Sequence, residues 1–324
     1  MPTVFVTRRL MPQALADLRD SFDVRLHDSD RPPERSEVLS RVAGADGLLA
    51  MANDPVDEEL LEAAGPRLRV VANFGVGYDN VDLDAASRRG VVVANTPGVL
   101  TGATAELTIA LLLDVLRRVS EGDRFLRSRE GWIWSPTFML GEGLEGKTLG
   151  IVGLGRIGRE VARLAEAFGM QVVFAGRCDA PDVPYRRVSL ETLLATVDVV
   201  SLHCPLTPET RHLVGAAALK AMRREAVLVN TTRGPVVDEA ALVDALREGE
   251  IAGAALDVYE REPEVHPGLL TLPNVVLAPH LGSATAAARR GMAALCAGAL
   301  RAVLLEGRCP ENALNPEAFR SAPR

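Results

Sequence analysis

The sequence predicts an α/β protein built from two doubly wound parallel sheets. Three observations predict this fold class. Short runs of apolar and β-branched residues alternate with amphipathic helix patterns along the chain. One such run, LGIVG, leads into glycines spaced G-x-G-x-x-G, and a helix pattern follows them directly. The length of 324 residues suits two domains of ordinary size.

The composition is that of a globular protein and argues against several function classes. Apolar residues make up 48% of the chain and charged residues 24%, so disorder is not expected. A net charge of −7 without a basic block argues against nucleic-acid binding. No apolar run approaches the length of a membrane span, and the first residues lack the profile of a signal peptide. The four cysteines show no metal-site or disulfide spacing, so we expect a cytoplasmic protein without a metal ion.

The first part of the chain reads as five strands joined by helices. Because helix-length crossovers separate the strands, they are predicted to form one parallel, flavodoxin-like sheet with right-handed connections. This part lacks the glycine fingerprint. The predicted strands are residues 4–7, 23–27, 46–51, 67–73 and 90–95, and the predicted helices are 10–18, 34–42, 57–64 and 82–89.

A second, Rossmann-like sheet is predicted to open at Thr148. A single long helix over residues 102–128 and a tryptophan-containing loop lead into it. A final helix, residues 284–305, is expected to pack back on the first part, with a polar tail after it. Further strands are predicted near residues 171–175, 197–202, 226–230, 251–257 and 274–278.

The glycine-rich turn predicts a dinucleotide site. Gly153 permits a tight turn, Gly155 lets a pyrophosphate approach the backbone, and Gly158 lets helix and strand pack closely. The phosphates would bind the N–H groups at the helix N-terminus. The alternative is an ordinary strand–turn–helix corner. The predicted cofactor contacts in this turn are Gly153, Leu154, Gly155, Arg156, Ile157 and Gly158.

These patterns predict a division of labour between two domains. Residues 1–98 plus 286–324 are expected to form a substrate-binding domain, and residues 99–285 an NAD(P)-binding domain. An active-site cleft is expected between them, because ligands bind beyond the carboxyl ends of the strands in such sheets.

The end of the strand after the glycine turn predicts which cofactor is preferred. A carboxylate there would bind the adenine ribose and favour NAD. The chain has Gly176 and Arg177 instead, and Asp179 follows in the loop. A guanidinium can bind the 2′-phosphate of NADP, so NADPH is predicted to be preferred, with NAD still possible. The alternative is that Arg177 is a solvated loop residue.

Three polar residues follow strands of the second sheet, where a nicotinamide would lie. Arg233 follows AVLVNTT, Glu262 closes DVYERE and His280 follows VVLAP. As an imidazolium, His280 would give a proton to the carbonyl oxygen of a 2-oxo acid as hydride arrives. Glu262 would stabilise the charged ring and raise its pKa. Arg233 would hold the substrate carboxylate and polarise the carbonyl.

Each of the three also has a structural interpretation. A lone histidine is more often structural than catalytic, Glu262 could be a solvated loop acid, and Arg233 could form a surface ion pair. His203 also ends a strand pattern, VVSLH, so spacing alone does not choose between the two histidines. We interpret His203 as part of the wall of the cofactor site.

Seven segments together resemble the D-isomer-specific 2-hydroxyacid dehydrogenases over nearly the whole chain. The resemblance implies that Arg233, Glu262 and His280 are the catalytic residues. It also implies that backbone N–H groups of Val76 and Gly77 bind the substrate carboxylate. The segments are NFGVGYDNVD (73–82), TAELT (104–108), GKTLGIVGLGRIG (146–158), HCPLTPETRHL (203–213), VNTTRGPVVDEAAL (229–242), AALDVYEREP (254–263) and APHLGSAT (278–285).

The same resemblance implies further cofactor contacts. Cys204, Pro205 and Thr210 are expected on the adenosine side. Those toward the nicotinamide and its ribose are Thr104, Thr231, Asp257 and Gly282, together with Arg233 and His280.

Within the family the chain is most similar to the glyoxylate and hydroxypyruvate reductases. The Gly176–Arg177 pair, the tryptophan-containing loop 131–146 and the length of the chain carry this similarity. The resemblance implies a homodimer in which Trp134 enters the partner's active site; the alternative is that both indoles only bury at an interface. Met51, at a strand end, would be an apolar wall that favours short side chains.

Two other functions remain open from the sequence. One is an NAD-dependent dehydrogenase of another D-2-hydroxy acid, such as 3-phosphoglycerate, although loops 51–54 and 74–78 carry no basic residue for a phosphate. Oxidation of formate or phosphite is a separate and less favoured enzymatic alternative. The other is a non-enzymatic NAD(P)-sensing scaffold, against which the complete catalytic set argues.

Overall fold

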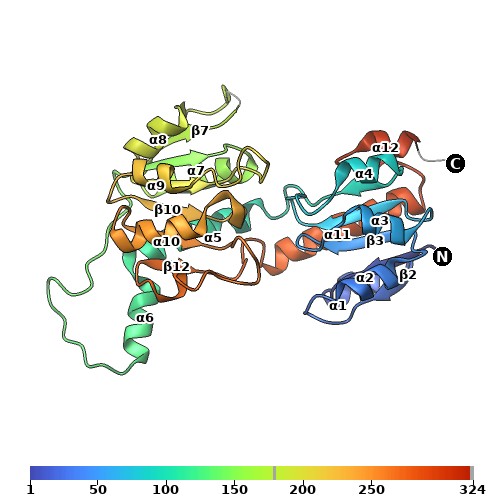
Figure 1. Cartoon of the computed structure of the whole chain (residues 1–324), viewed down its shortest axis with the longest axis horizontal. Coiled ribbons are helices and arrows are strands. Elements are labelled where there is room, and N and C mark those ends of the chain that lie inside the picture. The colour runs from blue at the N-terminus through green and yellow to red at the C-terminus, as the bar shows by residue number, and fades with distance from the viewer. Residues whose placement is uncertain (178–179, 322–324) are drawn as a thin grey trace. The chain divides into compact units, whose positions relative to one another are not determined.

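The structure, a computed structural model, describes residues 1–177 and 180–321. It divides into two compact units (Figure 1). The first unit contains Met1–Leu100 and Thr285–Arg324, and the second contains Thr101–Ala284. Among the described residues, no helix combines the length and the apolar character needed to cross a membrane.

The first unit is a five-stranded parallel sheet covered by helices. The strand order is β2-β1-β3-β4-β5, which is the flavodoxin-like order. Its strands are β1 (Thr3–Val6), β2 (Asp23–Leu26), β3 (Gly47–Met51), β4 (Val70–Phe74) and β5 (Val92–Ala94). The helices between them are α1 (Pro12–Arg19), α2 (Arg35–Val42), α3 (Glu58–Ala64) and α4 (Leu83–Arg88).

The central strands of this sheet are buried on both faces, which is why they read as continuous apolar runs. Helix α11 (Ala286–Leu304) packs against β4 and α1. A side chain at Gly47 would meet the side chain of Leu300 at 2.8 Å, so the glycine allows this helix to lie close to β3.

The end of the chain differs from the predicted polar tail. Its last described segment is a helix, α12 (Pro316–Ser321). Before that helix, the chain runs along the outer edge of β5, where the N–H of Leu314 donates to the carbonyl of Val93 at 2.7 Å. The buried side chain of Asn315 accepts the N–H of Val93 at 2.8 Å. These bonds pair backbone groups of the edge strand β5 that would otherwise be exposed without a partner.

The second unit is a seven-stranded parallel sheet in the order β12-β11-β10-β9-β6-β7-β8. From β6 the chain adds strands on one side as far as β8 and then on the other side from β9 to β12. Nucleotide-binding sheets have this reversal of strand order. The strands are β6 (Thr148–Val152), β7 (Gln171–Ala175), β8 (Arg186–Arg187), β9 (Val199–Leu202), β10 (Val227–Asn230), β11 (Gly253–Leu256) and β12 (Val275–Leu277). The helices are α5 (Thr101–Arg117), α6 (Val119–Arg127), α7 (Arg156–Ala167), α8 (Leu190–Thr196), α9 (Ala216–Ala221) and α10 (Glu239–Glu248).

Helices cover both faces of the second sheet. Residues of α5 and α7, such as Leu112 and Val161, pack on one face, and residues of α8 and α10, such as Leu193 and Leu242, pack on the other. Both sheets contain only parallel strands, so the predicted pair of parallel-sheet α/β domains is confirmed.

The prediction of a single helix over residues 102–128 is wrong, because the helix is interrupted at Arg118. That residue adopts a left-handed conformation with φ of 58° between α5 and α6. The carbonyl of Leu116 accepts the N–H of Glu142 at 2.9 Å instead of a bond within the helix. The carboxylate of Asp114 accepts the N–H of Ser120 at 2.7 Å, which begins the new helix. An apolar periodicity does not reveal these competing hydrogen bonds.

Candidate active site

The predicted catalytic residues follow three strands that lie side by side. Strands β10, β11 and β12 are neighbours in one parallel sheet. Their carboxyl ends therefore share one edge, and the loops after them carry Arg233, Glu262 and His280.

The structure pairs His280 with Glu262. Nδ1 of the imidazole lies 2.8 Å from Oε2 of the carboxylate, and the other carboxylate oxygen accepts the N–H of Tyr259 at 3.1 Å. His280 adopts a left-handed backbone conformation with φ of 54°, and its N–H donates to the carbonyl of Asp257 at 2.9 Å. The side chain of His280 remains 42% exposed, so the ring can reach a ligand from this edge.

The electrostatics of Glu262 favour its charged form. Burial raises the pKa of its carboxyl, but the hydrogen bond and charge of His280, the N–H of Tyr259 and the charge of Arg233 outweigh burial and hold the pKa below its ordinary value. A carboxylate that is charged at neutral pH is a suitable partner for an imidazolium.

His203 has a different environment from His280. Burial lowers the pKa of His203 to about 4, so its ring stays neutral at physiological pH. Its Nε2 lies 2.8 Å from the hydroxyl of Ser201. A neutral ring beside a hydroxyl suits the predicted wall of the cofactor site better than it suits an acid.

The residues assigned by resemblance to the nicotinamide side form a hydrogen-bonded layer. The carboxylate of the fully buried Asp257 accepts the N–H groups of Leu281 at 2.6 Å and Gly282 at 2.8 Å. The hydroxyl of Thr104 donates to the carbonyl of Gly282 at 3.0 Å. Thr231 likewise bonds to Thr108 on α5, at 2.9 Å between hydroxyl oxygens. These bonds hold the strand ends to α5.

The three glycines of the turn between β6 and α7 have different surroundings. Gly153 has φ of 95°, and a Cβ there would lie 2.7 Å from the backbone nitrogen of Cys204. A Cβ at Gly158 would lie 2.5 Å from the carbonyl oxygen of Gly153. At Gly155, by contrast, a Cβ would meet no described atom within 4 Å. The N-cap residue of α7 is Gly155, which has no side chain to bond the first N–H groups of the helix, so these groups suit a pyrophosphate.

The other residues of this turn divide between core and surface. Leu154 and Ile157 are partly buried against the core, whereas Arg156 is exposed. The loop after β9 places Cys204 in the core, where burial raises the pKa of its thiol to about 11. In the same loop, the hydroxyl of Thr210 donates to the carbonyl of Pro205 at 2.7 Å.

A further basic residue lies at the end of β7. Gly176 and Arg177 are both exposed there. The guanidinium of Arg187 donates to the carbonyl of Gly176 at 2.7 Å and to that of Arg177 at 3.3 Å. Arg187 belongs to β8, a two-residue strand that the sequence patterns do not predict. Asp179 lies outside the described residues.

The loop of residues 75–77, which is predicted to bind the substrate, is held in place through its carbonyl groups. The amide of Asn73 donates to the carbonyl of Gly77 at 2.8 Å, and the amide of Asn95 to that of Val76 at 2.7 Å. The N–H of Thr96 donates to the carbonyl of Gly75 at 3.0 Å. With these carbonyls bonded to neighbouring groups, the turn is suited to present N–H groups to an anion.

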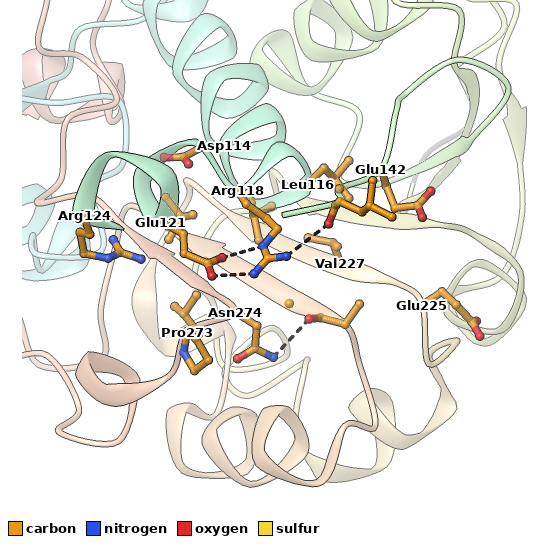
Figure 2. Close-up of a pocket in the computed structure, with 17 residues that line it drawn as sticks. Asp114, Leu116, Arg118, Glu121, Arg124, Glu142, Glu225, Val227, Pro273 and Asn274 are labelled. Atoms are coloured by element: carbon orange, nitrogen blue, oxygen red, sulfur yellow. Dashed lines mark hydrogen bonds and ion pairs between the residues drawn. The ribbon is translucent and has the colours of Figure 1, made fainter. Parts of the chain in front are cut away.

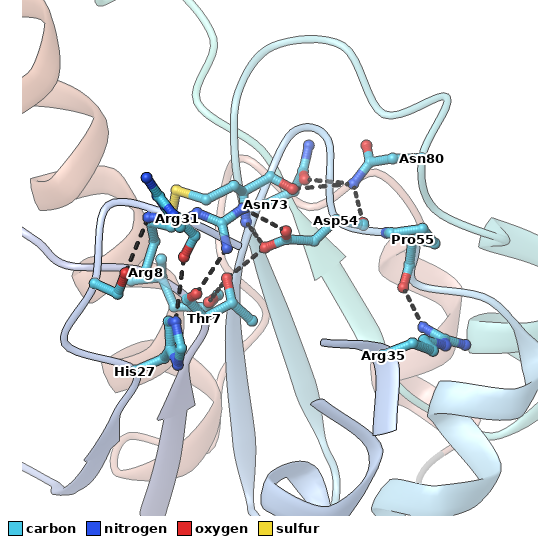
Figure 3. Close-up of polar contacts among 12 residues, drawn as sticks. Thr7, Arg8, His27, Arg31, Arg35, Asp54, Pro55, Asn73 and Asn80 are labelled. Carbon is cyan, nitrogen blue, oxygen red and sulfur yellow. Dashed lines mark hydrogen bonds and ion pairs between the residues drawn. The ribbon is translucent and has the colours of Figure 1, made fainter. Parts of the chain in front are cut away.

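Met51 is the last residue of β3, and the turn that follows it is built on a buried carboxylate (Figure 3). Asp54 accepts the N–H of Met51 at 2.9 Å and the guanidinium of Arg8 at 2.8 Å, and it also bonds to the hydroxyl of Thr7. Arg8 and Asp54 are each 8% exposed. Sequence patterns do not reveal this pair, because its members are 46 residues apart in the chain.

The two tryptophans of the loop after α6 have different surroundings. Trp132 stacks with Phe138, with ring centroids 6.3 Å apart, whereas Trp134 is 76% exposed. Figure 1 shows this loop running out from the body of the second unit.

A cavity of about 320 Å³ lies at the opposite edge of the second sheet (Figure 2). Its lining includes Val227, Gly253 and Val275, which begin β10, β11 and β12, together with the ion pair of Arg118 and Glu121. It therefore lies away from the predicted catalytic residues, which follow the ends of the same strands. Among the described residues, no group of three or more histidine, cysteine, aspartate or glutamate side chains could hold a metal ion.

Comparison with known proteins identifies relatives over the whole length of the chain. The family model for the NAD-binding domain of D-isomer specific 2-hydroxyacid dehydrogenases matches residues 109–282. The glyoxylate reductase of Thermococcus litoralis is 47% identical, covering 99% of this chain and 99% of that protein. The glyoxylate reductase of Aeropyrum pernix is 49% identical, covering 98% and 97%.

Solved structures show the same relationship. A Thermus thermophilus protein is 49% identical and superposes with a TM-score of 0.91, covering 96% of this chain and 99% of that chain. The NADPH-dependent glyoxylate/hydroxypyruvate reductase of Sinorhizobium meliloti, solved with NADP and malonate, is 36% identical. Its TM-score is 0.87, covering 97% and 98% of the two chains.

Proposed function

Because this chain belongs to the family of D-isomer specific 2-hydroxyacid dehydrogenases, we propose that it is an NADPH-preferring reductase of small 2-oxo acids. Glyoxylate and hydroxypyruvate are the proposed substrates, and the products are D-2-hydroxy acids. The observation that carries this proposal is the hydrogen bond of 2.8 Å between His280 and Glu262. The charge of Arg233 acts on the same carboxylate and helps to lower its pKa.

NADPH, when bound, supplies the hydride for the carbonyl carbon. The open space at Gly155 and the uncapped start of α7 fit its pyrophosphate. Because Nδ1 of His280 is engaged by Glu262, the other ring nitrogen is the one that gives its proton to the carbonyl oxygen. Glu262 stays ionised and stabilises the ring while it is charged.

Arg233 binds the substrate carboxylate and polarises the carbonyl in this proposal. The N–H groups of Val76 and Gly77 bind the same carboxylate, and Met51 limits the size of the substrate side chain. The tied carbonyls of residues 75–77 support this assignment, because they hold the backbone of the loop in one conformation. Thr104, Thr231, Asp257 and Gly282 support the nicotinamide side through the bonds already described.

The preference for NADPH is assigned to Arg177. It is exposed at the end of β7, next to a glycine that leaves room for a phosphate. Arg177→Gln should raise KM for NADPH about tenfold or more and leave KM for NADH nearly unchanged. Arg163→Gln, a change at an exposed arginine of α7, is the matched control. Equal effects on both cofactors would contradict the assignment.

The proposed substrate class is tested with the unmodified protein. Glyoxylate, hydroxypyruvate, pyruvate and 3-phosphohydroxypyruvate are each assayed with NADPH and with NADH. We expect the highest kcat/KM with glyoxylate or hydroxypyruvate and NADPH. A preference for the phosphorylated acid with NADH would instead favour the alternative dehydrogenase, and binding of NADPH without any turnover would favour a sensing scaffold.

A further inference from the structure

Two acidic residues outside the catalytic set join the loops that carry it. Glu239, the first residue of α10, is only 6% exposed, and its carboxylate accepts the N–H of Glu260 at 2.6 Å. The carboxylate of Glu260 in turn accepts the N–H of Glu239 at 3.3 Å. We call this reciprocal pair the 239–260 clasp.

The clasp joins the loops after β10 and β11. Glu260 lies two residues before Glu262 in the loop after β11. Beside the clasp, the backbone of Gly234 packs so tightly on the peptide between Tyr259 and Glu260 that a Cβ at 234 would lie 1.8 Å from the carbonyl carbon of Tyr259. Arg233 directly precedes that glycine, and Glu262 follows two residues after Glu260. The two loops therefore meet close in sequence to both catalytic side chains.

A third loop contacts the 239–260 clasp. His212, in the loop after β9, has a left-handed backbone with φ of 52°. Its N–H donates to the carbonyl of Pro235 at 2.8 Å, and its ring Nε2 bonds to the carboxylate of Glu260. One residue thus contacts both the Arg233 loop, through Pro235, and the Glu262 loop, through Glu260.

The choice of a buried carboxylate for this joint has a cost. Burial raises the pKa of Glu239, which shows that the charged form loses solvation there. An alanine or leucine at the start of α10 would avoid this cost. What the carboxylate adds is a directed bond between two loops, and such bonds fix relative positions.

From this arrangement, we infer that Glu239 and Glu260, supported by His212, are positioning residues that hold Arg233 in register with the Glu262–His280 pair. The inference rests on the proposed function, since the register matters only if the three side chains act on one substrate. A displacement of about 1 Å at a catalytic group can reduce turnover about 100-fold. The clasp itself contacts no reacting atom.

The test compares Glu239→Ala with Glu239→Gln, because glutamine keeps an oxygen that accepts the N–H of Glu260. We expect Glu239→Ala to lower kcat with glyoxylate and NADPH about tenfold to 100-fold. The Kd for NADPH, measured by fluorescence titration, should change less than about twofold, and Glu239→Gln should restore most of the turnover. The matched control is Glu248→Ala, at an exposed residue of the same helix.

In the single variants of Glu239, three results would overturn the inference. They are wild-type turnover in Glu239→Ala, an equal loss in the alanine and glutamine variants, and a parallel loss of NADPH binding. If Glu239→Ala does not fold, Glu260→Ala takes its place, because that side chain is 25% exposed. In the double variant Glu239→Ala/Glu260→Ala, the loss of turnover should be about as large as that of the stronger single variant, because both bonds belong to one clasp. Losses of turnover that multiply would also overturn the inference.

Failure of the clasp can be distinguished from failure of the proposed function. Amide hydrogen exchange in the peptide over residues 257–264 should be faster in Glu239→Ala than in the wild-type protein, whether or not either reduces a 2-oxo acid. Unchanged exchange there would overturn the clasp. Absence of turnover in the wild-type protein, with faster exchange in the variant, would reject only the proposed substrate class.

Discussion

At the scale of single residues, the two histidines at strand ends differ in the partner that each has. His280 bonds to a carboxylate that stays charged, whereas His203 bonds to the hydroxyl of Ser201 and is held neutral by burial. The motif spacing alone does not separate them. The difference comes from Glu262, which is 18 residues from His280 in the chain and reaches it only because β11 and β12 are adjacent.

Glu262 should make stability depend on pH in one direction. Its pKa in the folded protein lies below the ordinary value of 4.5, so its stabilising contribution is present above that pH. The contribution is lost as pH falls through the folded-state pKa. The free energy of unfolding of the wild-type protein, minus that of Glu262→Gln, should therefore decrease below about pH 4.5. Urea unfolding of both proteins at several pH values measures this difference in the free energy of unfolding.

The control for this measurement is Glu248→Gln, at an exposed residue of α10. Its difference from the wild-type protein should be small at every pH. If the difference for Glu262→Gln were also constant with pH, the carboxylate would not be stabilised in the way described here.

The sequence predicts which residues share a place in the fold where the sheet topology brings their positions together. Arg233, Glu262 and His280 follow strand patterns, and parallel strands bring such positions to one edge. The partners Glu239 and Glu260 are not predictable in this way, because their bonds depend on how two loops fold back on each other.

At the scale of elements, the turn from β6 into α7 assigns separate roles to its glycines. Gly158 is packed against the backbone of Gly153, whereas Gly155 faces open space. Gly158→Ala should therefore reduce the free energy of unfolding by about 1–3 kcal/mol. Gly155→Ala should leave stability nearly unchanged but weaken NADPH binding about tenfold or more, because a methyl group would occupy the space proposed for the pyrophosphate.

Thermal unfolding and NADPH titration of both variants measure these effects. The two glycines are each other's control, since the same substitution is made three residues apart. A loss of stability in Gly155→Ala equal to that in Gly158→Ala would contradict the separate roles.

The elements that sequence patterns miss are those set by polar contacts. The helix patterns do not show that Asp114 accepts an N–H group from the first turn of α6, nor that the carbonyl of Leu116 accepts the N–H of Glu142. Strand β8 consists of two exposed arginines, so it has no apolar run to reveal it. The buried strands and amphipathic helices are predictable, because their apolar positions repeat with the period of the element.

At the scale of the whole molecule, the alternation of strands and helices predicts both sheets, and both are present with parallel strands only. The first sheet has the flavodoxin-like order and the second the nucleotide-binding order. Right-handed crossovers leave few other topologies for such a pattern.

We propose that the molecule is a homodimer to which the loop after α6 contributes. Ile133 and Trp134 are 85% and 76% exposed, which is unusual for large apolar side chains unless a partner covers them. Light scattering after size exclusion should give a mass near twice 34.6 kDa. A monomer at micromolar concentration would contradict the proposal.

The two tryptophans should respond differently to substitution. Trp134→Ala should raise KM for glyoxylate several-fold, because its indole is proposed to enter the partner's site. Trp132→Ala should mainly lower the melting temperature, since that ring stacks with Phe138. Steady-state kinetics and thermal unfolding of both variants measure this, and an unchanged KM in Trp134→Ala would leave it only a structural role.

The most direct test of the account is the effect of removing the acid. His280→Ala should lower kcat for glyoxylate reduction about 100-fold or more, because His280 is the proposed donor of the proton to the carbonyl oxygen. The Kd for NADPH should stay within about twofold of the wild-type value, since the glycine turn after β6 is untouched. If His280→Ala kept wild-type turnover, the assignment of this histidine as the proton donor, and the mechanism built on it, would be contradicted.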